Sequence, residues 1–205
     1  TSDTETILQL IARSKSEGPV ARFVDALRLV DGAYAVIALT AGKLLGVRDP
    51  LGIRPLVIGK LSDQFILSSE TCALDIIGAE FVREVENGEV VVISDDGIES
   101  FFPFKPALKR PCIFEYIYFA RPDSIFGGLS VYECRKNFGH ELARESPVKA
   151  DVVIPIPDSG VPAALGFSEE AKIPFALGII RNHYVGRTFI EPQQSSRDFG
   201  VKLKH

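Results

Sequence analysis

The sequence predicts two successive folds: an α+β layered sandwich over residues 1–104, and the start of an α/β domain over residues 105–205. Three observations predict this division. Helical patterns precede antiparallel hairpins in the first part, proline and lysine become frequent near residues 101–112, and apolar strands alternate with helical patterns after them. Unbroken apolar strands that alternate with helices are typical of a parallel sheet.

The first part opens with two amphipathic helices. Ser2 or Asp3 can cap a helix over residues 5–14, whose apolar residues recur on one face, and residues 20–30 repeat this pattern. A third, short helix fits residues 71–79.

Antiparallel hairpins are expected around that short helix. Residues 32–50 and residues 55–70 each predict two strands joined by a turn. A third hairpin is expected over residues 81–97, because Asn87-Gly88 is a strong turn signal.

The second part has a different pattern. The apolar run at residues 112–120 predicts a strand, and residues 130–146 predict a helix. Residues 151–157 and 173–180 predict parallel strands, joined by a turn and a helix over residues 158–172.

The composition is that of an ordinary globular protein, with 46% hydrophobic residues and a net charge of −4. The acidic balance argues against a nucleic-acid partner, and no apolar stretch is long enough for a membrane span. The three widely spaced cysteines predict no disulfide framework and favour a reducing compartment. Since the sequence contains no Met, we expect it to be an internal piece of a longer protein.

The turn Pro157–Gly160, with the sequence PDSG, is the first candidate site. It follows a predicted strand and precedes a helix, where backbone N–H groups can bind phosphate. Asp158 could hold a hydroxyl group or a metal-bound water. The alternative is a helix cap and tight turn without a ligand, and the residue types leave both open.

The second candidate is the polar stretch at residues 181–200. Residues 181–205 contain five basic and two acidic residues, a net charge of +3 in an acidic chain. Arg181, Tyr184 and Arg187 could close over a phosphate-bearing substrate, because arginine suits bidentate phosphate binding. A solvated surface loop is the alternative, but its position after a strand favours function.

The segment at residues 48–56, RDPLGIRPL, predicts a structured turn with an internal ion pair, because Arg48, Asp49 and Arg54 surround proline and glycine. These residues alone do not predict a particular reaction.

Eight motifs occur together, in this order: SDTE, GAYAVI, RDPLGIRPL, SSETCALDIIGA, REVENGE, EYIYFARPDS, PIPDSG and YVGRTFIEP. In order and spacing they resemble the amidophosphoribosyltransferase family over essentially the whole chain. SDTE and the strands after it are shared with other N-terminal-nucleophile amidotransferases, whereas EYIYFARPDS and YVGRTFI are more specific.

The resemblance implies an N-terminal-nucleophile-type sandwich followed by a phosphoribosyltransferase-type domain. The first domain would release ammonia from glutamine. The second would use it to displace pyrophosphate from 5-phosphoribosyl pyrophosphate, the first step of de novo purine (IMP) biosynthesis. The resemblance also implies Mg²⁺, feedback inhibition by purine nucleotides, a homotetramer, and a cytoplasmic or plastid-stromal location.

The resemblance further implies roles for particular residues. Asp3, in SDTE, corresponds to the carboxylate that grips the amino group of glutamine. Asp158, Ser159 and Gly160 correspond to the pyrophosphate loop, and residues 181–190 to a mobile loop over phosphoribosyl pyrophosphate. The loop residues expected to act are Arg181, Tyr184 and Arg187 toward that substrate, and Tyr184, Arg187 and Ile190 along an ammonia channel.

Cys112 corresponds to an iron–sulfur ligand in members that carry a [4Fe–4S] cluster, although members without the cluster can have cysteine there too. The family's nucleophilic cysteine and glutamine-binding arginine are expected before Thr1, and its acidic motif after His205. We therefore expect no catalytic residue in these 205 residues and no activity from them alone.

Two other functions stay open. An amino-sugar-forming amidotransferase would show sugar-isomerase motifs after the first domain, and a non-catalytic regulator with the phosphoribosyltransferase fold would lack a glutaminase half.

Overall fold

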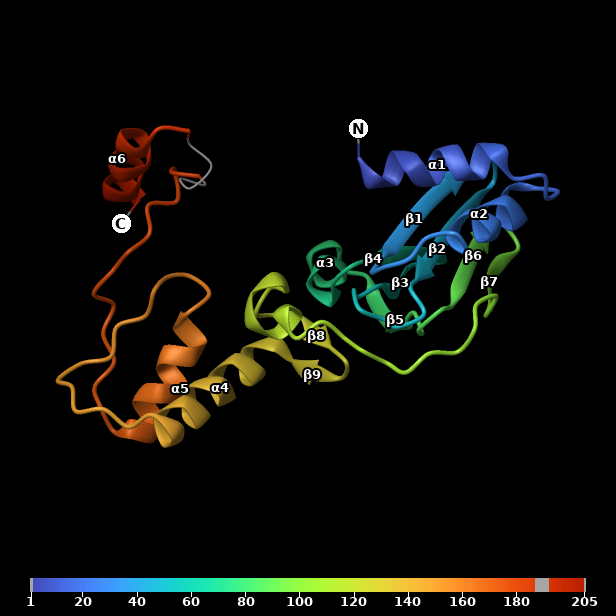
Figure 1. Ribbon diagram of the computed structural model, residues 1–205. Coiled ribbons are helices and arrows are strands. Elements are labelled where there is room, and N and C mark those ends of the chain that lie inside the picture. The colour runs from blue at the N-terminus through green and yellow to red at the C-terminus, as the bar shows by residue number, and fades with distance from the viewer. Residues whose placement is uncertain (1, 187–191, 205) are drawn as a thin grey trace. The chain divides into compact units, whose positions relative to one another are not determined.

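The computed structural model describes residues 2–186 and 192–204 (Figure 1). The chain divides into two compact units, one comprising Thr1–Glu115 and Phe119–Gly128, the other Tyr116–Tyr118 and Leu129–His205. This division does not coincide with the predicted boundary between residues 104 and 105, which stays a prediction about domains.

The first unit contains three helices and two antiparallel sheets. The helices are α1 (Asp3–Arg13), α2 (Pro19–Leu27) and α3 (Thr71–Ile77). One sheet has the order β1-β2-β6-β7, with β1 (Ala35–Thr40), β2 (Lys43–Arg48), β6 (Val90–Ser94) and β7 (Gly97–Phe101). The other has the order β4-β3-β5, with β3 (Val57–Leu61), β4 (Gln64–Ser68) and β5 (Glu80–Glu84).

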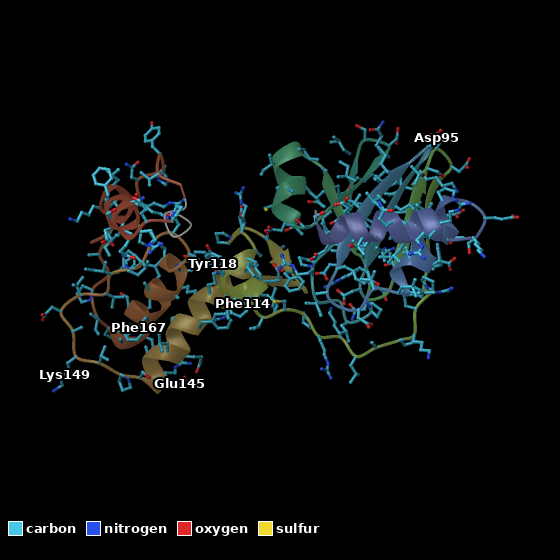
Figure 2. All side chains as sticks on the ribbon, turned by 45° about the horizontal axis from the view of Figure 1, so that its top comes forward. Asp95, Phe114, Tyr118, Glu145, Lys149 and Phe167 are labelled. Carbon is cyan, nitrogen blue, oxygen red and sulfur yellow. The ribbon has the colours of Figure 1, made fainter. Side chains whose placement is uncertain are left out.

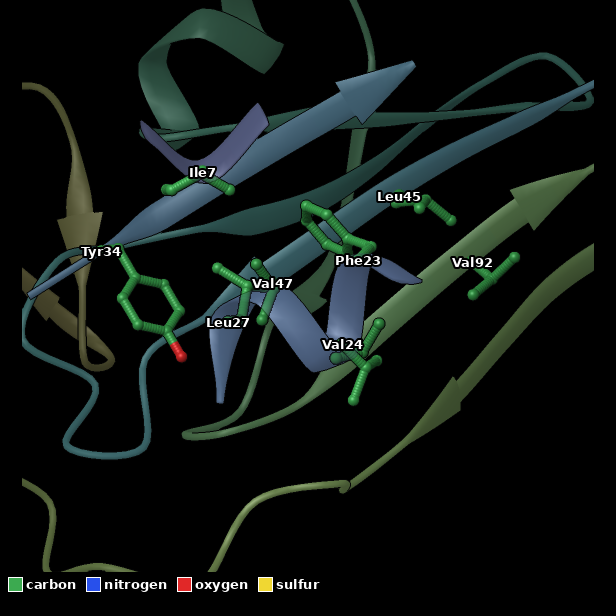
Figure 3. Close-up of a cluster of buried hydrophobic side chains, with 9 residues drawn as sticks. Ile7, Phe23, Val24, Leu27, Tyr34, Leu45, Val47 and Val92 are labelled. Carbon is green, nitrogen blue, oxygen red and sulfur yellow. The ribbon is translucent and has the colours of Figure 1, made fainter. Parts of the chain in front are cut away.

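The side-chain alternation of the strands builds a four-layer sandwich. Val90 and Val92 pack against α1 and α2, whereas Val91, on the opposite face of β6, packs between the two sheets. In the second sheet Ile58 faces the first sheet, and Val57 packs against Leu74 of α3. Figure 3 shows the cluster beneath α1 and α2. The layered sandwich predicted for the first part is therefore confirmed.

The first two predicted hairpins are confirmed, and the third is wrong. β1 pairs with β2, and β3 pairs with β4. The turn at Asn87-Gly88 exists, but β5 pairs with β3 and β6 pairs with β2, so this turn carries the chain from one sheet to the other. The backbone around it is bound elsewhere, since Val85 N–H donates to Leu56 and Gly88 N–H donates to Arg48. The third hairpin is instead β6–β7.

The second unit contains the helices α4 (Val131–Glu145), α5 (Val161–Ala171) and α6 (Gln194–Lys204). Two short strands precede α4: β8 (Ile125–Phe126), which belongs to the first unit, and β9 (Leu129–Ser130), which belongs to the second. α4 and α5 pack closely, because a Cβ atom at Gly139 would lie only 1.9 Å from the carbonyl oxygen of Ala163. The helices predicted over residues 130–146 and 158–172 are confirmed.

The strand predicted over residues 112–120 is wrong. Residues Glu115–Phe119 form a π-helical turn, η1, in which Ala120 N–H donates to the Glu115 carbonyl at 3.1 Å. Phe114 and Tyr118 lie at this turn (Figure 2). The buried carboxylate of Glu115 pairs with Arg54 and holds the segment here. The backbone of η1 therefore forms its hydrogen bond within the turn rather than with a neighbouring strand.

The predicted parallel strands at residues 151–157 and 173–180 form no regular strand in the described part of the chain. They meet in one parallel bridge, Val153↔Phe175, with hydrogen bonds of 2.8 and 3.0 Å. Pro155 and Pro157 lack the N–H groups that a continuing ladder would need. The direction of pairing agrees with the prediction, and a parallel sheet stays a prediction.

Among the described residues, no helix has the length and apolar character that a membrane crossing requires.

Candidate functional site

The loop at residues 48–56 is stabilised by two buried charged side chains. Arg48 Nε donates to the Arg54 carbonyl at 2.8 Å, and Asp49 accepts the Leu51 N–H at 2.9 Å. Further partners are Gly52, Val85 and Glu84 for Arg48, and Tyr34 and Ile53 for Asp49. The predicted structured turn is confirmed, but the internal ion pair is wrong, because the Asp49 carboxylate binds backbone N–H groups.

Arg54, at the end of this loop, pairs with a distant carboxylate. Its Nε lies 3.0 Å from Oε1 of Glu115, and its guanidinium lies over the ring of Phe119 at 4.7 Å from the centroid. Glu115 is buried, whereas 42% of the Arg54 side chain is exposed. Burial raises the pKa of the Glu115 carboxyl above its ordinary value, and the charge of Arg54 opposes this rise.

A cavity of about 710 Å³ in the first unit, here called the Asp3 cavity, lies beside the start of α1. Its wall includes Asp3, Tyr34, Arg54 and Ser69, which come from four separate segments. Asp3 is exposed in the first turn of α1. A carboxylate in this position can accept charge-assisted hydrogen bonds from an ammonium group. The structure thus places Asp3 in a ligand-sized cavity, and its role toward glutamine stays a prediction.

Tyr34 also lines the Asp3 cavity. Its burial, with a smaller effect of Asp49, raises the pKa of the phenol to about 12. The hydroxyl group therefore keeps its proton at neutral pH and can donate.

The PDSG turn leads directly into α5 and lies beside the start of the basic stretch. Arg181 Nη1 donates to Asp158 Oδ2 at 2.6 Å, so the structure brings the two candidate segments together. Gly160 is the residue before α5, and a Cβ atom there would lie 2.6 Å from the Ile156 carbonyl oxygen. The Pro157–Asp158 peptide bond is cis.

Two backbone N–H groups at this turn donate hydrogen bonds to carbonyl groups of the same segment. Gly160 N–H donates to the Ile156 carbonyl at 3.1 Å, and Val161 N–H donates to the Asp158 carbonyl at 3.3 Å. These two N–H groups are therefore already hydrogen-bonded within the turn.

The basic stretch is only partly a loop, since α6 begins at Gln194. Asn182 holds the end of this helix: its N–H donates to the Lys204 carbonyl at 2.7 Å, and its side-chain amide donates to the Leu203 carbonyl at 3.1 Å. Tyr184 is 99% exposed. Arg187 and Ile190, predicted for substrate binding and the ammonia channel, lie outside the described residues.

Cys112 is half-buried, and its N–H donates to the Ile53 carbonyl at 3.0 Å. Residues 2–186 and 192–204 contain no group of three His, Cys, Asp or Glu that could hold a metal ion. An iron–sulfur cluster of the predicted type needs four thiolates, and the sequence has three cysteines. The residues present therefore do not form a cluster site, and Cys112 stays a candidate for one ligand.

Sequence reasoning missed Glu115 and its link to Arg54. One signal could have found it: a carboxylate inside the aromatic run FEYIYF must either be exposed or find a cationic partner. The partner itself, 61 positions earlier in the chain, follows only from the fold.

Comparison with known proteins gives one consistent relationship. The family profile described as a glutamine amidotransferase domain matches residues 1–75. An amidophosphoribosyltransferase of Rhizobium etli is 60% identical over 100% of this chain, and the chloroplastic amidophosphoribosyltransferase of Glycine max is 56% identical. The chain covers 42% and 36% of these relatives, so it spans less than half of their length.

A solved structure agrees with this relationship. Glutamine phosphoribosylpyrophosphate amidotransferase from B. subtilis, complexed with ADP and GMP, matches with a TM-score of 0.91 and 45% sequence identity. The match covers 100% of this chain and 45% of that chain. Together with the amidotransferase profile and the four layers, it supports the predicted N-terminal-nucleophile-type fold of the first part.

Proposed function

We propose that this chain, which is related over its whole length to the amidophosphoribosyltransferases, serves in an enzyme that makes 5-phosphoribosylamine from glutamine and 5-phosphoribosyl pyrophosphate. Water hydrolyses the glutamine side-chain amide to glutamate and ammonia. The ammonia nitrogen then attacks C1 of the ribose, the bond to pyrophosphate breaks, and pyrophosphate leaves with the electron pair. The reaction would begin de novo purine biosynthesis.

The observation that carries this proposal is the single relationship that spans the chain at 60% identity and includes both candidate sites. An amino-sugar-forming enzyme would share only the sandwich. A regulator without a glutaminase half would not share residues 1–75 with glutamine amidotransferase domains.

In the glutaminase half, Asp3 would bind the α-ammonium group of glutamine. Its position on the wall of the Asp3 cavity supports this role, because an exposed carboxylate in a cavity can orient the substrate without first being desolvated. Tyr34 would supply a neutral hydrogen-bond donor on the same wall.

In the acceptor half, Asp158, Ser159 and Gly160 would contact the pyrophosphate group. Arg181 is supported as a phosphate ligand by its position against Asp158, where an anion can compete for the guanidinium. Tyr184 and Arg187 would complete the closure over the substrate, and with Ile190 would line the ammonia passage and keep water out.

Cofactors and partners belong to the same proposal. Mg²⁺ would enter with the pyrophosphate group, because it is usually bound through substrate phosphates and only one or two carboxylates. We also propose a homotetramer, and feedback inhibition by purine nucleotides, which the complex of the B. subtilis relative with ADP and GMP supports. The location would be the cytoplasm, or the plastid stroma in a plant, where the Glycine max relative is named chloroplastic.

The test uses a hybrid protein in which these 205 residues replace the matching segment of the Rhizobium etli relative. Phosphoribosylamine formation is measured with glutamine and, separately, with ammonium chloride. In the hybrid, Asp3→Asn should lower glutamine-dependent formation about tenfold or more, because a charge-assisted hydrogen bond is lost. Ammonium-dependent formation should not change.

Glu5→Gln is the matched control. Glu5 is also an acidic residue in the first turn of α1 but does not line the Asp3 cavity. A general effect of charge at the helix N-terminus would change both variants equally and would contradict the role of Asp3. A folded hybrid that forms no phosphoribosylamine from either nitrogen source would refute the proposed function.

A further inference from the structure

Arg54 both lines the Asp3 cavity and contacts the π-helical turn η1. It lines the Asp3 cavity, and its guanidinium contacts Glu115 at 3.0 Å and the ring of Phe119 at 4.7 Å. Motion at either Glu115 or Phe119 therefore reaches the cavity wall through one side chain.

Glu115 and Phe119 are the first and last residues of η1, and both belong to the first unit. The three residues between them belong to the second unit. The chain thus contributes three residues of η1 to the second unit before it returns to the first, and Arg54 contacts the first and last residues of this turn.

Backbone hydrogen bonds fasten the segment before η1 to the same loop that carries Arg54. Arg110 N–H donates to the Leu51 carbonyl at 2.8 Å, and Cys112 N–H donates to the Ile53 carbonyl at 3.0 Å. The loop at residues 48–56 and the segment before η1 are therefore held together on either side of the contact between Arg54 and Glu115.

The segment after η1 is fastened beside another residue of the cavity wall. Ser69 lines the Asp3 cavity, and the next residue, Glu70, accepts hydrogen bonds from Arg121 N–H at 2.7 Å and from the Ser124 hydroxyl at 2.8 Å. Both flanks of η1 are therefore attached next to the cavity.

We propose that Arg54 is a positioning residue that couples the Asp3 cavity to η1, so that glutamine hydrolysis follows the state of the acceptor half. This inference rests on the proposed function. The coupling needs arginine in particular, because its planar guanidinium can pair with Glu115 and stack on Phe119 together. Lysine keeps the charge but cannot reproduce both contacts.

A purely structural role for the ion pair is the alternative, and the chain contains a matched control for it. Arg83 and Glu89 form a second pair with nearly the same burial: the arginine is 40% exposed and the glutamate 2%, against 42% and 2% for Arg54 and Glu115. Arg83 and Glu89 do not line the Asp3 cavity. Substitutions in both pairs cost stability, but only those at Arg54 or Glu115 should alter coupling.

The experiment compares Arg54→Lys and Glu115→Gln with Arg83→Lys and Glu89→Gln in the Rhizobium hybrid. Three quantities are measured: glutamate released per phosphoribosylamine formed, the ammonium-dependent rate, and the melting temperature. We expect Arg54→Lys to raise the glutamate ratio about threefold or more, while the ammonium-dependent rate stays within about twofold. Glu115→Gln should raise the ratio in the same direction.

The controls should lower the melting temperature without changing the glutamate ratio. Equal glutamate ratios in the Arg54→Lys and Arg83→Lys hybrids would overturn the coupling role while leaving the proposed function intact. An unsubstituted hybrid that forms no phosphoribosylamine from glutamine or ammonium would instead overturn the proposed function itself.

Discussion

Asp158 and Arg181 form an ion pair of 2.6 Å across 23 positions of sequence. The pair joins the PDSG turn to the first residue of the basic stretch. With side chains 56% and 36% exposed, it is worth no more than about 1 kcal/mol, so an anion can displace the carboxylate from the arginine. The pair therefore orients the Arg181 guanidinium while leaving it available to an anionic ligand.

Asp158→Asn should strengthen the binding of inorganic pyrophosphate to the 205-residue chain in the absence of divalent cations. The substitution removes a negative charge that competes for Arg181, and we expect a decrease in Kd of about threefold. Isothermal titration calorimetry measures this change. Asp151→Asn, an exposed acidic residue in the same unit, is the control for net charge. Equal effects of the two substitutions on Kd would show that the Asp158 carboxylate does not compete with pyrophosphate for Arg181.

Gly139→Ala should destabilise the second unit by about 2 kcal/mol or more, because overpacking against a rigid backbone cannot be relieved by a side-chain movement. The added Cβ atom would lie 1.9 Å from the carbonyl oxygen of Ala163 in α5. Thermal unfolding measures the loss. Gly186→Ala is the control, since no atom lies within 4 Å of its Cβ position, and a loss as large as that of Gly139→Ala would contradict the tight crossing of α4 and α5.

Glu115 should make the protein more stable in mild acid. Burial raises its folded-state pKa above the ordinary value of 4.5, so the folded state binds its proton more tightly than the unfolded state. The stability from this group is fully present below pH 4.5 and is lost as the pH rises through the folded-state pKa. The Glu115→Gln variant should lack this pH dependence in urea unfolding.

Glu89 should have the opposite pH dependence. Burial acts to raise its pKa, but hydrogen bonds from Arg83 and from Glu86 N–H outweigh burial, so the folded-state pKa lies below 4.5. Its stabilisation is present above pH 4.5 and is lost as the pH falls through the folded-state pKa. The loss of unfolding free energy caused by Glu89→Gln should grow with pH, and that caused by Glu115→Gln should shrink with pH. If both losses changed with pH in the same direction, the assignment of these two buried carboxylates would be wrong.

In the first part, local sequence patterns predicted where the strands lie better than they predicted which strands pair with one another. The hairpins β1–β2 and β3–β4 follow from alternation and short turns. The turn at Asn87-Gly88 was equally visible, yet turn chemistry cannot say which strand lies beside β5. That choice is made by packing, because Val85 and Val91 must both reach the layer between the two sheets.

The second part shows where apolar composition misleads. The run around Glu115 has the composition of a strand, but its carboxylate is buried against Arg54, and this contact fixes a π-helical turn instead. For the candidate sites, Asp3 and Asp158 could be found from motif and position. Arg54 and Glu115 could not, because their pairing depends on two segments that meet only in the folded chain.

The 205-residue chain alone should hydrolyse no glutamine. The residues that line the Asp3 cavity include no cysteine, so no thiol of the described chain is in position to attack a bound amide. Cys72 and Cys134 lie outside the Asp3 cavity, and burial raises the pKa of both thiols, which lowers their nucleophilicity at neutral pH. Glutamate release is measured with the chain and with the Rhizobium hybrid at equal concentration, the hybrid being the positive control. Turnover by the chain alone, abolished by Cys72→Ser or Cys134→Ser, would show that one of these two thiols can reach the substrate, and would contradict the cavity as the site of hydrolysis.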